Sequence, residues 1–322
     1  MAFGPAFDSM MDPSRNGMVL TFILPPRHCN LHCPVCVIRQ RKEVEDKDGA
    51  ELEIGDYISF IESVRKKVTV SHIAIQGYEP LLPESWPYTK SILEYANRIG
   101  IESSLATNGT FLDQYLSDLS TFSLKKVSVS LDAPSAAQHD FRRGVDGAFN
   151  ATSRNLEAAA KTSGLMESLW VTSVLYPDNV QVLYNMPEFL KRKKILRWAI
   201  SPLIQIGNDH DEGGVAFSYE ELKAAIVLLS KQASDAKIEF RVDDEFSLFR
   251  NEIPIIPFSV YRSIERVDNI IRLGPNGLCS IGREILKTVT KKTLRWVPNQ
   301  EHPDAFWDRV DSARKRSLEK AA

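Results

Sequence analysis

Three cysteines lie close together near the start of the chain, at a spacing that suits an iron–sulfur cluster. They are Cys29, Cys33 and Cys36, in the pattern Cys-x3-Cys-x2-Cys, and the fourth cysteine of the 322 residues is Cys279. Three thiolates on one short loop bind three irons of a cubane and leave the fourth iron without a protein ligand. A metal centre needs such an open position in order to act on a bound molecule. The pattern therefore predicts a [4Fe-4S] cluster that takes part in chemistry.

Structural zinc and inert buried thiols are the alternative interpretations of these cysteines. Structural zinc takes four ligands, often as two separated pairs. Here His28 or His32 would have to supply the fourth ligand, and His28 directly adjoins the first cysteine. On this interpretation the chain is a non-catalytic metal-binding interaction protein. Disulfide frameworks belong to short secreted chains, whereas clustered cysteines in a longer chain favour metal.

Composition narrows the class of protein. The chain is 43% apolar and 25% charged, with a formal net charge of −2. This balance gives no electrostatic footprint for nucleic acid or for an anionic membrane. No apolar run approaches the roughly 20 residues that a spanning helix needs, and the first 15 residues lack the order of a secretion signal. We expect a cytoplasmic protein with neither a nucleic-acid nor a membrane partner.

Short apolar runs alternate with helical patterns over most of the chain. The predicted strands are residues 18–24, 72–76, 101–107, 126–131, 169–175, 196–200 and 238–242. The predicted helices are residues 55–67, 86–98, 112–119, 147–162, 180–191 and 219–232. Repeated strand–helix units build a parallel sheet through right-handed crossovers. The chain between residues 18 and 245 is shorter than the roughly 250 residues of a closed eightfold barrel.

The predicted fold class is therefore α/β, a partial (β/α)6-type open parallel barrel with a short C-terminal cap. The predicted divisions are an N-terminal extension (1–17), the barrel (18–245), and a C-terminal cap and helix (246–322). Residues 254–282 lose the regular alternation and contain several prolines and glycines. A basic helix is expected from about Pro303.

The cysteine motif after the first strand resembles the radical S-adenosylmethionine (SAM) superfamily, and further motifs follow in the order of that family. Residues 76–80 (QGYEP) look like its Gly-Gly-Glu-Pro motif, and residues 107–110 (TNGT) follow the third strand. Residues 128–132 (SVSLD) form the fourth strand, and residues 142–144 (RRG) and 147–149 (GAF) come after it. The resemblance covers residues 18 to 205. It departs from the family pattern at Gln76 and Tyr78, and at Val35, where many members carry an aromatic residue near the adenine.

The resemblance implies two cofactors, a [4Fe-4S] cluster and SAM, whose amino and carboxylate groups bind the open iron. It also implies a reductive reaction, in which an electron cleaves SAM to methionine and a 5′-deoxyadenosyl radical. That radical abstracts a hydrogen atom from the substrate. A reducing protein such as flavodoxin or ferredoxin is the expected electron donor.

The family motifs place the candidate cofactor-binding residues at the ends of predicted strands, where parallel sheets build their sites. Gly77 lets backbone groups approach the cofactor because it has no Cβ. Glu79 ties down the loop or the amine of SAM, while Asn108 and Ser130 suit ribose hydroxyls or the carboxylate. Asp132 acts similarly or caps the following turn. The predicted set is Gln76, Gly77, Tyr78, Glu79, Asn108, Ser130 and Asp132.

Cys279 is the candidate catalytic residue. It lies in a turn-rich stretch (GPNGLCSIG), where site residues are common. A thiol S–H bond is weaker than a C–H bond, so a cysteine can quench a substrate radical and invert a stereocentre. The arrangement is similar to radical epimerases of aminoglycoside biosynthesis, whose relatives include dehydrogenases and decarboxylases of antibiotic pathways. The alternative is a small buried hydrophobic side chain. One further cysteine is too few for an auxiliary cluster.

The expected function is epimerisation of a small polar substrate, a sugar or aminosugar, with Cys279 as hydrogen-atom donor. Dehydrogenation, in which an electron returns to the cluster, or decarboxylation of a carbohydrate-derived natural product is the alternative. A peptide substrate is disfavoured, because no peptide-recognition domain is visible before Met18. Acidic residues that could bind substrate amino groups are Asp209, Asp211, Glu212, Asp243, Asp244 and Glu245.

Overall fold

The computed structural model describes residues 17–34, 36, 38, 51–202, 217–242, 270–281, 294–295 and 297–321. Its strands are β1 (Met18–Phe22), β2 (Val70–Ile75), β3 (Glu102–Thr107), β4 (Leu124–Ser130), β5 (Leu169–Leu175), β6 (Arg197–Pro202), β7 (Glu239–Val242), β8 (Ile270–Leu273), β9 (Leu278–Ile281) and β10 (Leu294–Arg295). Its helices are α2 (Ile54–Arg65), α3 (Trp86–Arg98), η1 (Leu112–Tyr115), α4 (Leu116–Leu119), α5 (Ala136–Arg143), α6 (Ala148–Ala159), α7 (Val180–Leu183), α8 (Met186–Arg192), α9 (Tyr219–Ala236) and α11 (Pro303–Ala321).

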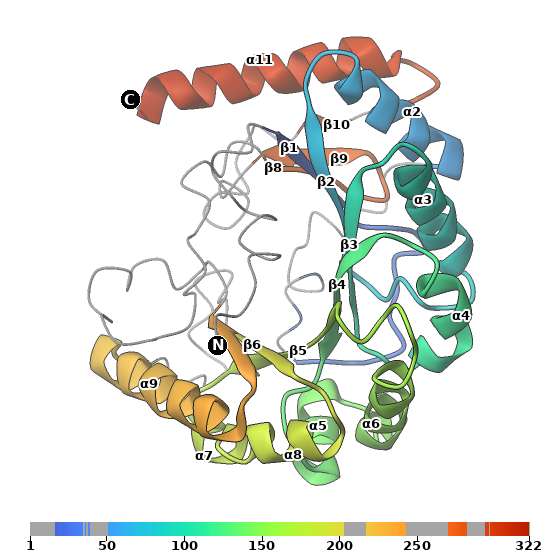
Figure 1. The fold of residues 1–322 in the computed structure, drawn as a ribbon. Helices are drawn as coiled ribbons and strands as arrows, with labels where there is room; N and C mark the ends of the chain where they lie inside the picture. Colours follow the sequence, from blue (N-terminus) through green and yellow to red (C-terminus); the bar gives the residue numbers. More distant parts are fainter. Residues whose placement is uncertain are drawn as a thin grey trace.

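All of these strands belong to one sheet, in the order β10-β9-β8-β1-β2-β3-β4-β5-β6-β7. Strands β8 and β1 to β7 are parallel to one another, and β9 and β10 are added at the β8 edge by antiparallel pairing. The sheet curves with its helices on the outer face, and within the described residues its two edge strands, β7 and β10, do not pair with each other (Figure 1). The predicted α/β fold with an open parallel barrel is confirmed.

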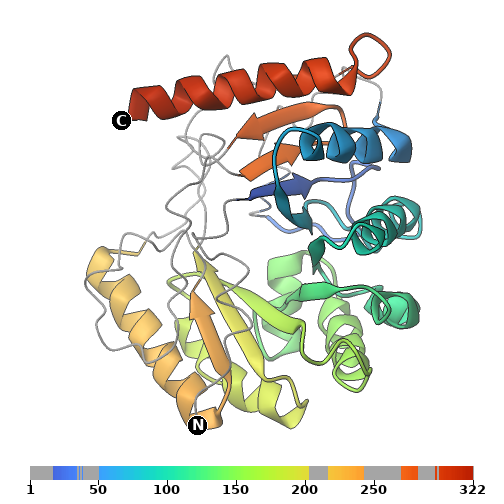
Figure 2. The same cartoon turned by 45° about the horizontal axis from the view of Figure 1, so that its top comes forward.

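The outer face of the sheet is apolar and lies under the helices. Phe22 of β1 packs edge-on against Tyr57 and Phe60 of α2, with ring centroids 5.4 and 6.5 Å apart. Phe60 in turn contacts Phe306 and Trp307 of α11, at centroid distances of 5.9 and 6.4 Å. Aromatic pairs of this kind contribute about 0.5–1.5 kcal/mol each beyond the area they bury. The C-terminal helix therefore shares the core of the barrel (Figure 2).

The inner face of the sheet is more polar. Residues paired across neighbouring strands point to the same side of a sheet. On this side Ala106 is paired with Ser128, Ser128 with Trp170, and Ser130 with Thr172. Ser128 and Thr172 also share a hydrogen bond of 2.6 Å. The barrel interior thus offers hydroxyl groups close to the carboxyl ends of β4 and β5.

The region expected as a C-terminal cap extends the barrel sheet. β8 pairs with β1, with Thr21 opposite Arg272, and β9 folds back beside β8 through the turn at residues 274–277. These strands are too short, and follow one another too closely, for the strand–helix rhythm to reveal them. The predicted boundary at residue 245 lies outside the described residues.

The predicted helices agree with the structure apart from local differences. The segment 112–119 divides into η1 and α4, and 180–191 divides into α7 and α8, with Pro187 in the first turn of α8. α5 was not predicted, because its eight residues (AAQHDFRR) are mostly polar and form only about two turns. In the described part of the chain, no helix combines the length and hydropathy required to span a bilayer.

His72 makes the stability of the fold depend on pH. Burial lowers the pKa of this histidine from 6.5 to about 4, and its Nε2 lies 2.9 Å from the Ser104 hydroxyl. Because the pKa is lower in the folded chain, the unfolded chain takes up the proton first. The stability that neutral His72 preserves is therefore lost as the pH falls from about 6.5 towards 4.

We predict that His72→Gln flattens this dependence, because glutamine stays neutral at every pH tested. Relative to the parent chain, its free energy of unfolding should improve by on the order of 2–3 kcal/mol between pH 7 and 4. Urea unfolding followed by circular dichroism measures the change. His28→Gln, which removes a half-exposed imidazole, is the control and should track the parent. Parallel curves for all three chains would contradict the assignment.

Candidate active site

The cysteine loop follows β1 and is attached to the C-terminal end of α5. The backbone N–H of His32 donates to the carbonyl of Arg143 at 2.8 Å. Gly144 makes this approach possible, because it has φ +67° and a Cβ at this position would lie 2.4 Å from the His32 carbonyl oxygen. The loop therefore depends on a glycine more than 100 residues further along the chain.

Two of the three cysteine sulfurs accept hydrogen bonds from nearby N–H groups. The Leu31 backbone N–H and the Asn108 side-chain amide donate to Cys29 Sγ at 3.4 and 3.6 Å. The Arg143 guanidinium reaches Cys33 Sγ at 3.9 Å. Burial raises the pKa of the Cys29 thiol to about 11, against the lowering effect of its Leu31 and Asn108 hydrogen bonds. Metal binding must displace this proton, because thiolates and not thiols ligate metals.

One cavity joins the cysteines to the carboxyl ends of the parallel strands. All three cysteine side chains border it, together with residues that follow or end β2, β3 and β4. Its lining consists of Cys29, Leu31, Cys33, Cys36, Gly77, Tyr78, Ala106, Thr107, Asn108, Ser130 and Arg143. Seven of the predicted site residues therefore meet here, and Gln76 precedes Gly77 directly after β2.

Gly77 brings the loop after β2 against the cysteine loop. Its φ of +117° is rare for residues with a side chain, and an added Cβ would lie 2.5 Å from Ile23 Cγ2. Both constraints select glycine. At Gly77 no side chain therefore stands between the backbone and the cavity, as expected of a site that holds a cofactor closely.

Glu79 is not among the described residues that line the cavity, but it hydrogen-bonds to two that do, Thr107 and Asn108. Its carboxylate is 1% exposed and accepts from Leu81 N–H at 2.9 Å, from the Thr107 hydroxyl at 2.6 Å and from Asn108 N–H at 2.7 Å. Burial raises the pKa of this carboxyl to about 7, while these hydrogen bonds act in the opposite direction. Glu79 thus joins the ends of β2 and β3, which is the loop-tying role among those expected for it.

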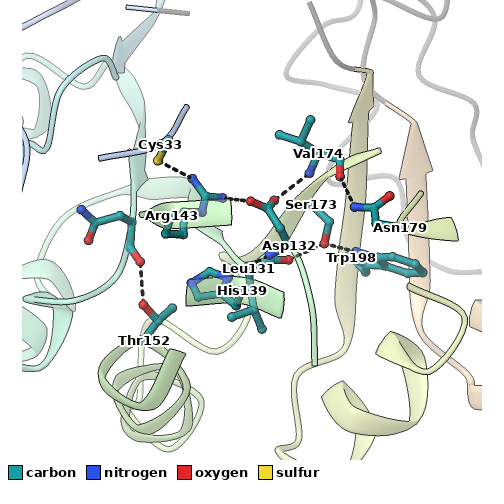
Figure 3. Close-up of polar contacts among 11 residues, drawn as sticks. Cys33, Leu131, Asp132, His139, Arg143, Thr152, Ser173, Val174, Asn179 and Trp198 are labelled. Atoms are coloured by element: carbon teal, nitrogen blue, oxygen red, sulfur yellow. Dashed lines mark hydrogen bonds and ion pairs between the residues drawn. The ribbon is translucent and has the colours of Figure 1, made fainter. Parts of the chain in front are cut away.

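Asp132 lies beside the cavity, paired with Arg143. Its carboxylate is 2.8 Å from the guanidinium and accepts the Val174 backbone N–H at 2.9 Å. The backbone N–H of Asp132 donates to His139 Nδ1 at 3.2 Å. Figure 3 shows these groups as one polar network between the cysteine loop and β5. In this structure Asp132 therefore faces Arg143. Arg143 belongs to the motif at residues 142–144, but the sequence assigned no role to it.

Comparisons with known proteins agree with this geometry. Residues 23–182 match the model of the Radical SAM superfamily. These residues form a radical SAM domain.

Two curated relatives match part of the chain. One is an AdoMet-dependent heme synthase of Methanosarcina barkeri, 31% identical over 134 residues, which are 41% of this chain and 36% of that protein. Another is a probable GTP 3′,8-cyclase of Methanococcus maripaludis, 34% identical over 112 residues, which are 34% of this chain and 35% of that protein. The chain therefore matches only about a third of the length of these relatives.

A similar solved structure extends the likeness of fold beyond the radical SAM domain. Streptococcus suis SuiB, crystallised with its precursor peptide SuiA, superposes with a TM-score of 0.68 at 12% identity. The superposition covers 96% of this chain and 70% of SuiB. At this level of identity the likeness concerns the fold alone.

The cofactors of a radical SAM domain are a [4Fe-4S] cluster and SAM, and the cavity residues fit both. Three thiols face one cavity, with N–H donors directed at two of the sulfurs. Among the described residues, no three Cys, His, Asp or Glu side chains converge as they would around a single ion. A cubane takes each thiolate on a different iron, so its ligands do not have to converge. Bare backbone at Gly77 and the polar groups of Asn108 and Ser130 suit SAM.

Cys279 lies on the other face of the sheet. It is paired with Leu273, which is paired with Phe22, and Phe22 packs against α2 on the helix-covered side. Paired residues share a face, so the Cys279 thiol points into the outer core, where it is 1% exposed. It is not among the described residues that line the cavity. Of the two interpretations of Cys279, this placement favours the small buried hydrophobic side chain over the hydrogen-atom donor.

Several expected contributors fall outside the described residues. They are Val35 and the six acidic residues Asp209, Asp211, Glu212, Asp243, Asp244 and Glu245. Sequence reasoning also gave no role to Arg143, Thr107 or Leu31, which line the cavity. Arg143 and Thr107 both lie in motifs that resemble those of the family, and this was the available signal for them. Leu31 carried none.

We predict that Gly77→Ala destabilises the radical SAM domain more than Gly100→Ala does. Both glycines have positive φ, at +117° and +70°, but only Gly77 is crowded, since nothing lies within 4 Å of a Cβ at Gly100. Strain alone costs on the order of 1–3 kcal/mol, and the Ile23 clash adds to it at Gly77. Urea unfolding measures both losses, and equal losses would show that the contact with Ile23 is not limiting.

Proposed function

We propose that this protein is a radical SAM enzyme that abstracts a hydrogen atom from a small polar substrate held in the barrel. The supporting observation is the single cavity in which the three cysteines meet Gly77, Asn108 and Ser130. Motifs spread over about 100 residues of sequence converge there, which inert thiols would not require.

In this proposal the residues around the cavity have distinct roles. Cys29, Cys33 and Cys36 hold the cluster, and Glu79 keeps the ends of β2 and β3 in register around SAM. When bound, the reduced cluster and SAM supply the 5′-deoxyadenosyl radical that attacks a substrate C–H bond. The surrounding sheet excludes water and oxygen from that radical.

The inner face of the sheet supports a polar substrate. Thr172 is paired with Ser130, which borders the cavity, and Ser128 lies two residues before Ser130 on the same face of β4. Hydroxyl groups of this kind pair with substrate hydroxyl or amine groups, as a carbohydrate or aminosugar would require. The names of the curated relatives do not define this substrate, because their alignments cover about a third of each protein.

The placement of Cys279 bears on the fate of the substrate radical. Epimerisation needs a hydrogen-atom donor inside the barrel, and the Cys279 thiol points to the helix-covered side. Dehydrogenation needs no such donor, because the substrate radical loses a second electron and a proton. We therefore place dehydrogenation of a polar substrate ahead of epimerisation through Cys279.

We predict that the anaerobically reconstituted protein binds about four irons per chain and, with dithionite and SAM, releases 5′-deoxyadenosine. Cys33→Ala should abolish both, because it removes a cluster ligand. Cys279→Ala should retain both, because its side chain lies in the outer core. Iron analysis and mass spectrometry provide the two measurements. A parent protein that binds one zinc and never cleaves SAM would contradict the proposal that this protein is an enzyme.

A further inference from the structure

Arg143 places a positive charge against one cluster ligand. Its Nη1 lies 3.9 Å from Cys33 Sγ, and its Nη2 lies 2.8 Å from the Asp132 carboxylate. Its side chain is 13% exposed and that of Asp132 is 3% exposed. The guanidinium therefore stands between a sulfur and a carboxylate with little water to screen it.

The surrounding network fixes the guanidinium in this position. Asp132 is itself held by the Val174 N–H. The Val174 carbonyl accepts a hydrogen bond from Asn179 at 2.8 Å, and Asn179 Oδ1 accepts from Tyr176 N–H at 2.8 Å. Figure 3 shows Arg143 pointing at Cys33 on one side and at Asp132 on the other. The orientation is thus set by β5 and the turn after it, outside the cysteine loop.

We propose that Arg143, oriented by Asp132, raises the reduction potential of the cluster by donating an N–H···S hydrogen bond to Cys33. The inference rests on the proposed function in one respect, since it requires a cluster on the three cysteines. Reduction adds one electron to the cluster and makes its thiolate ligands more negative. A buried cation that donates to a ligand sulfur stabilises the reduced form, and hydrogen bonds to sulfur are among the factors that set cluster potentials.

Arg142 provides a matched comparison within the same helix. Its guanidinium stacks on the Tyr176 ring at 4.0 Å and pairs with Asp178, whose side chain is 69% exposed. No contact between Arg142 and a cysteine is present among the described residues. Arg142→Gln and Arg143→Gln therefore remove the same charge from neighbouring positions, but only the second removes the contact with Cys33. Arg143 acts through the ligand, so it is a positioning residue.

The experiment is a redox titration of the reconstituted proteins without SAM, followed by electron paramagnetic resonance of the reduced cluster. We expect Arg143→Gln to shift the midpoint potential to a more negative value than the parent. Arg142→Gln should stay close to the parent. Arg143→Lys should lie between the parent and Arg143→Gln, because the ammonium keeps the charge but not the fork that bridges Cys33 and Asp132.

The outcomes separate this inference from the proposed function. If the parent binds no cluster, both the proposed function and this inference are wrong. If the parent binds a cluster but Arg143→Gln has the potential of Arg142→Gln, the inference alone is wrong. If Arg143→Gln does not retain a cluster, Arg143→Lys decides: a potential more negative than that of Arg142→Gln supports the inference, and an equal or more positive one overturns it.

Discussion

Parallel pairing of neighbouring strands is the constraint on which the site depends. In a parallel sheet every carboxyl end lies at the same edge, so the segments that follow β1, β2, β3 and β4 must meet. The cysteine loop follows β1, Gly77 follows β2, Asn108 follows β3 and Ser130 ends β4. Each of these segments is short, and the sheet rather than the loops determines how far apart they lie.

Buried charges near this edge are held by specific partners. Glu79 is satisfied by donors from two segments, and Arg143 is balanced by Asp132. Burial acts to lower the pKa of Arg143, but Asp132, Cys33 and Tyr176 together raise it, so the guanidinium stays charged. A buried ion pair of this kind is weak support for stability, since desolvation offsets much of the attraction. Its place beside Cys33 fits a role in the chemistry of the site.

The outer face of the sheet forms the hydrophobic core, and the inner face borders the cavity. The outer face packs Phe22 against α2, and α2 against α11, so the C-terminal helix stabilises the strand that leads into the cysteine loop. The inner face carries hydroxyl groups and borders the cavity. Cys279 belongs to the outer face, where a thiol is a small apolar side chain in a core. Its chemistry as a sulfur is therefore separated from the cavity by the thickness of the sheet.

The sequence alone determined the parallel barrel and the three cysteines through local patterns, and it gave the cofactors through the resemblance of its motifs to a known family. Strands 18–24 and 169–175 were visible as apolar runs, and the cysteine spacing is a property of eight consecutive residues. The short β8 and β9 and the polar α5 lacked such patterns. Only the tertiary structure showed that Arg143 faces Cys33, 110 residues away, and that Cys279 points away from the cavity. Both depend on strand register and on packing between distant segments, since one step of register turns a side chain to the opposite face.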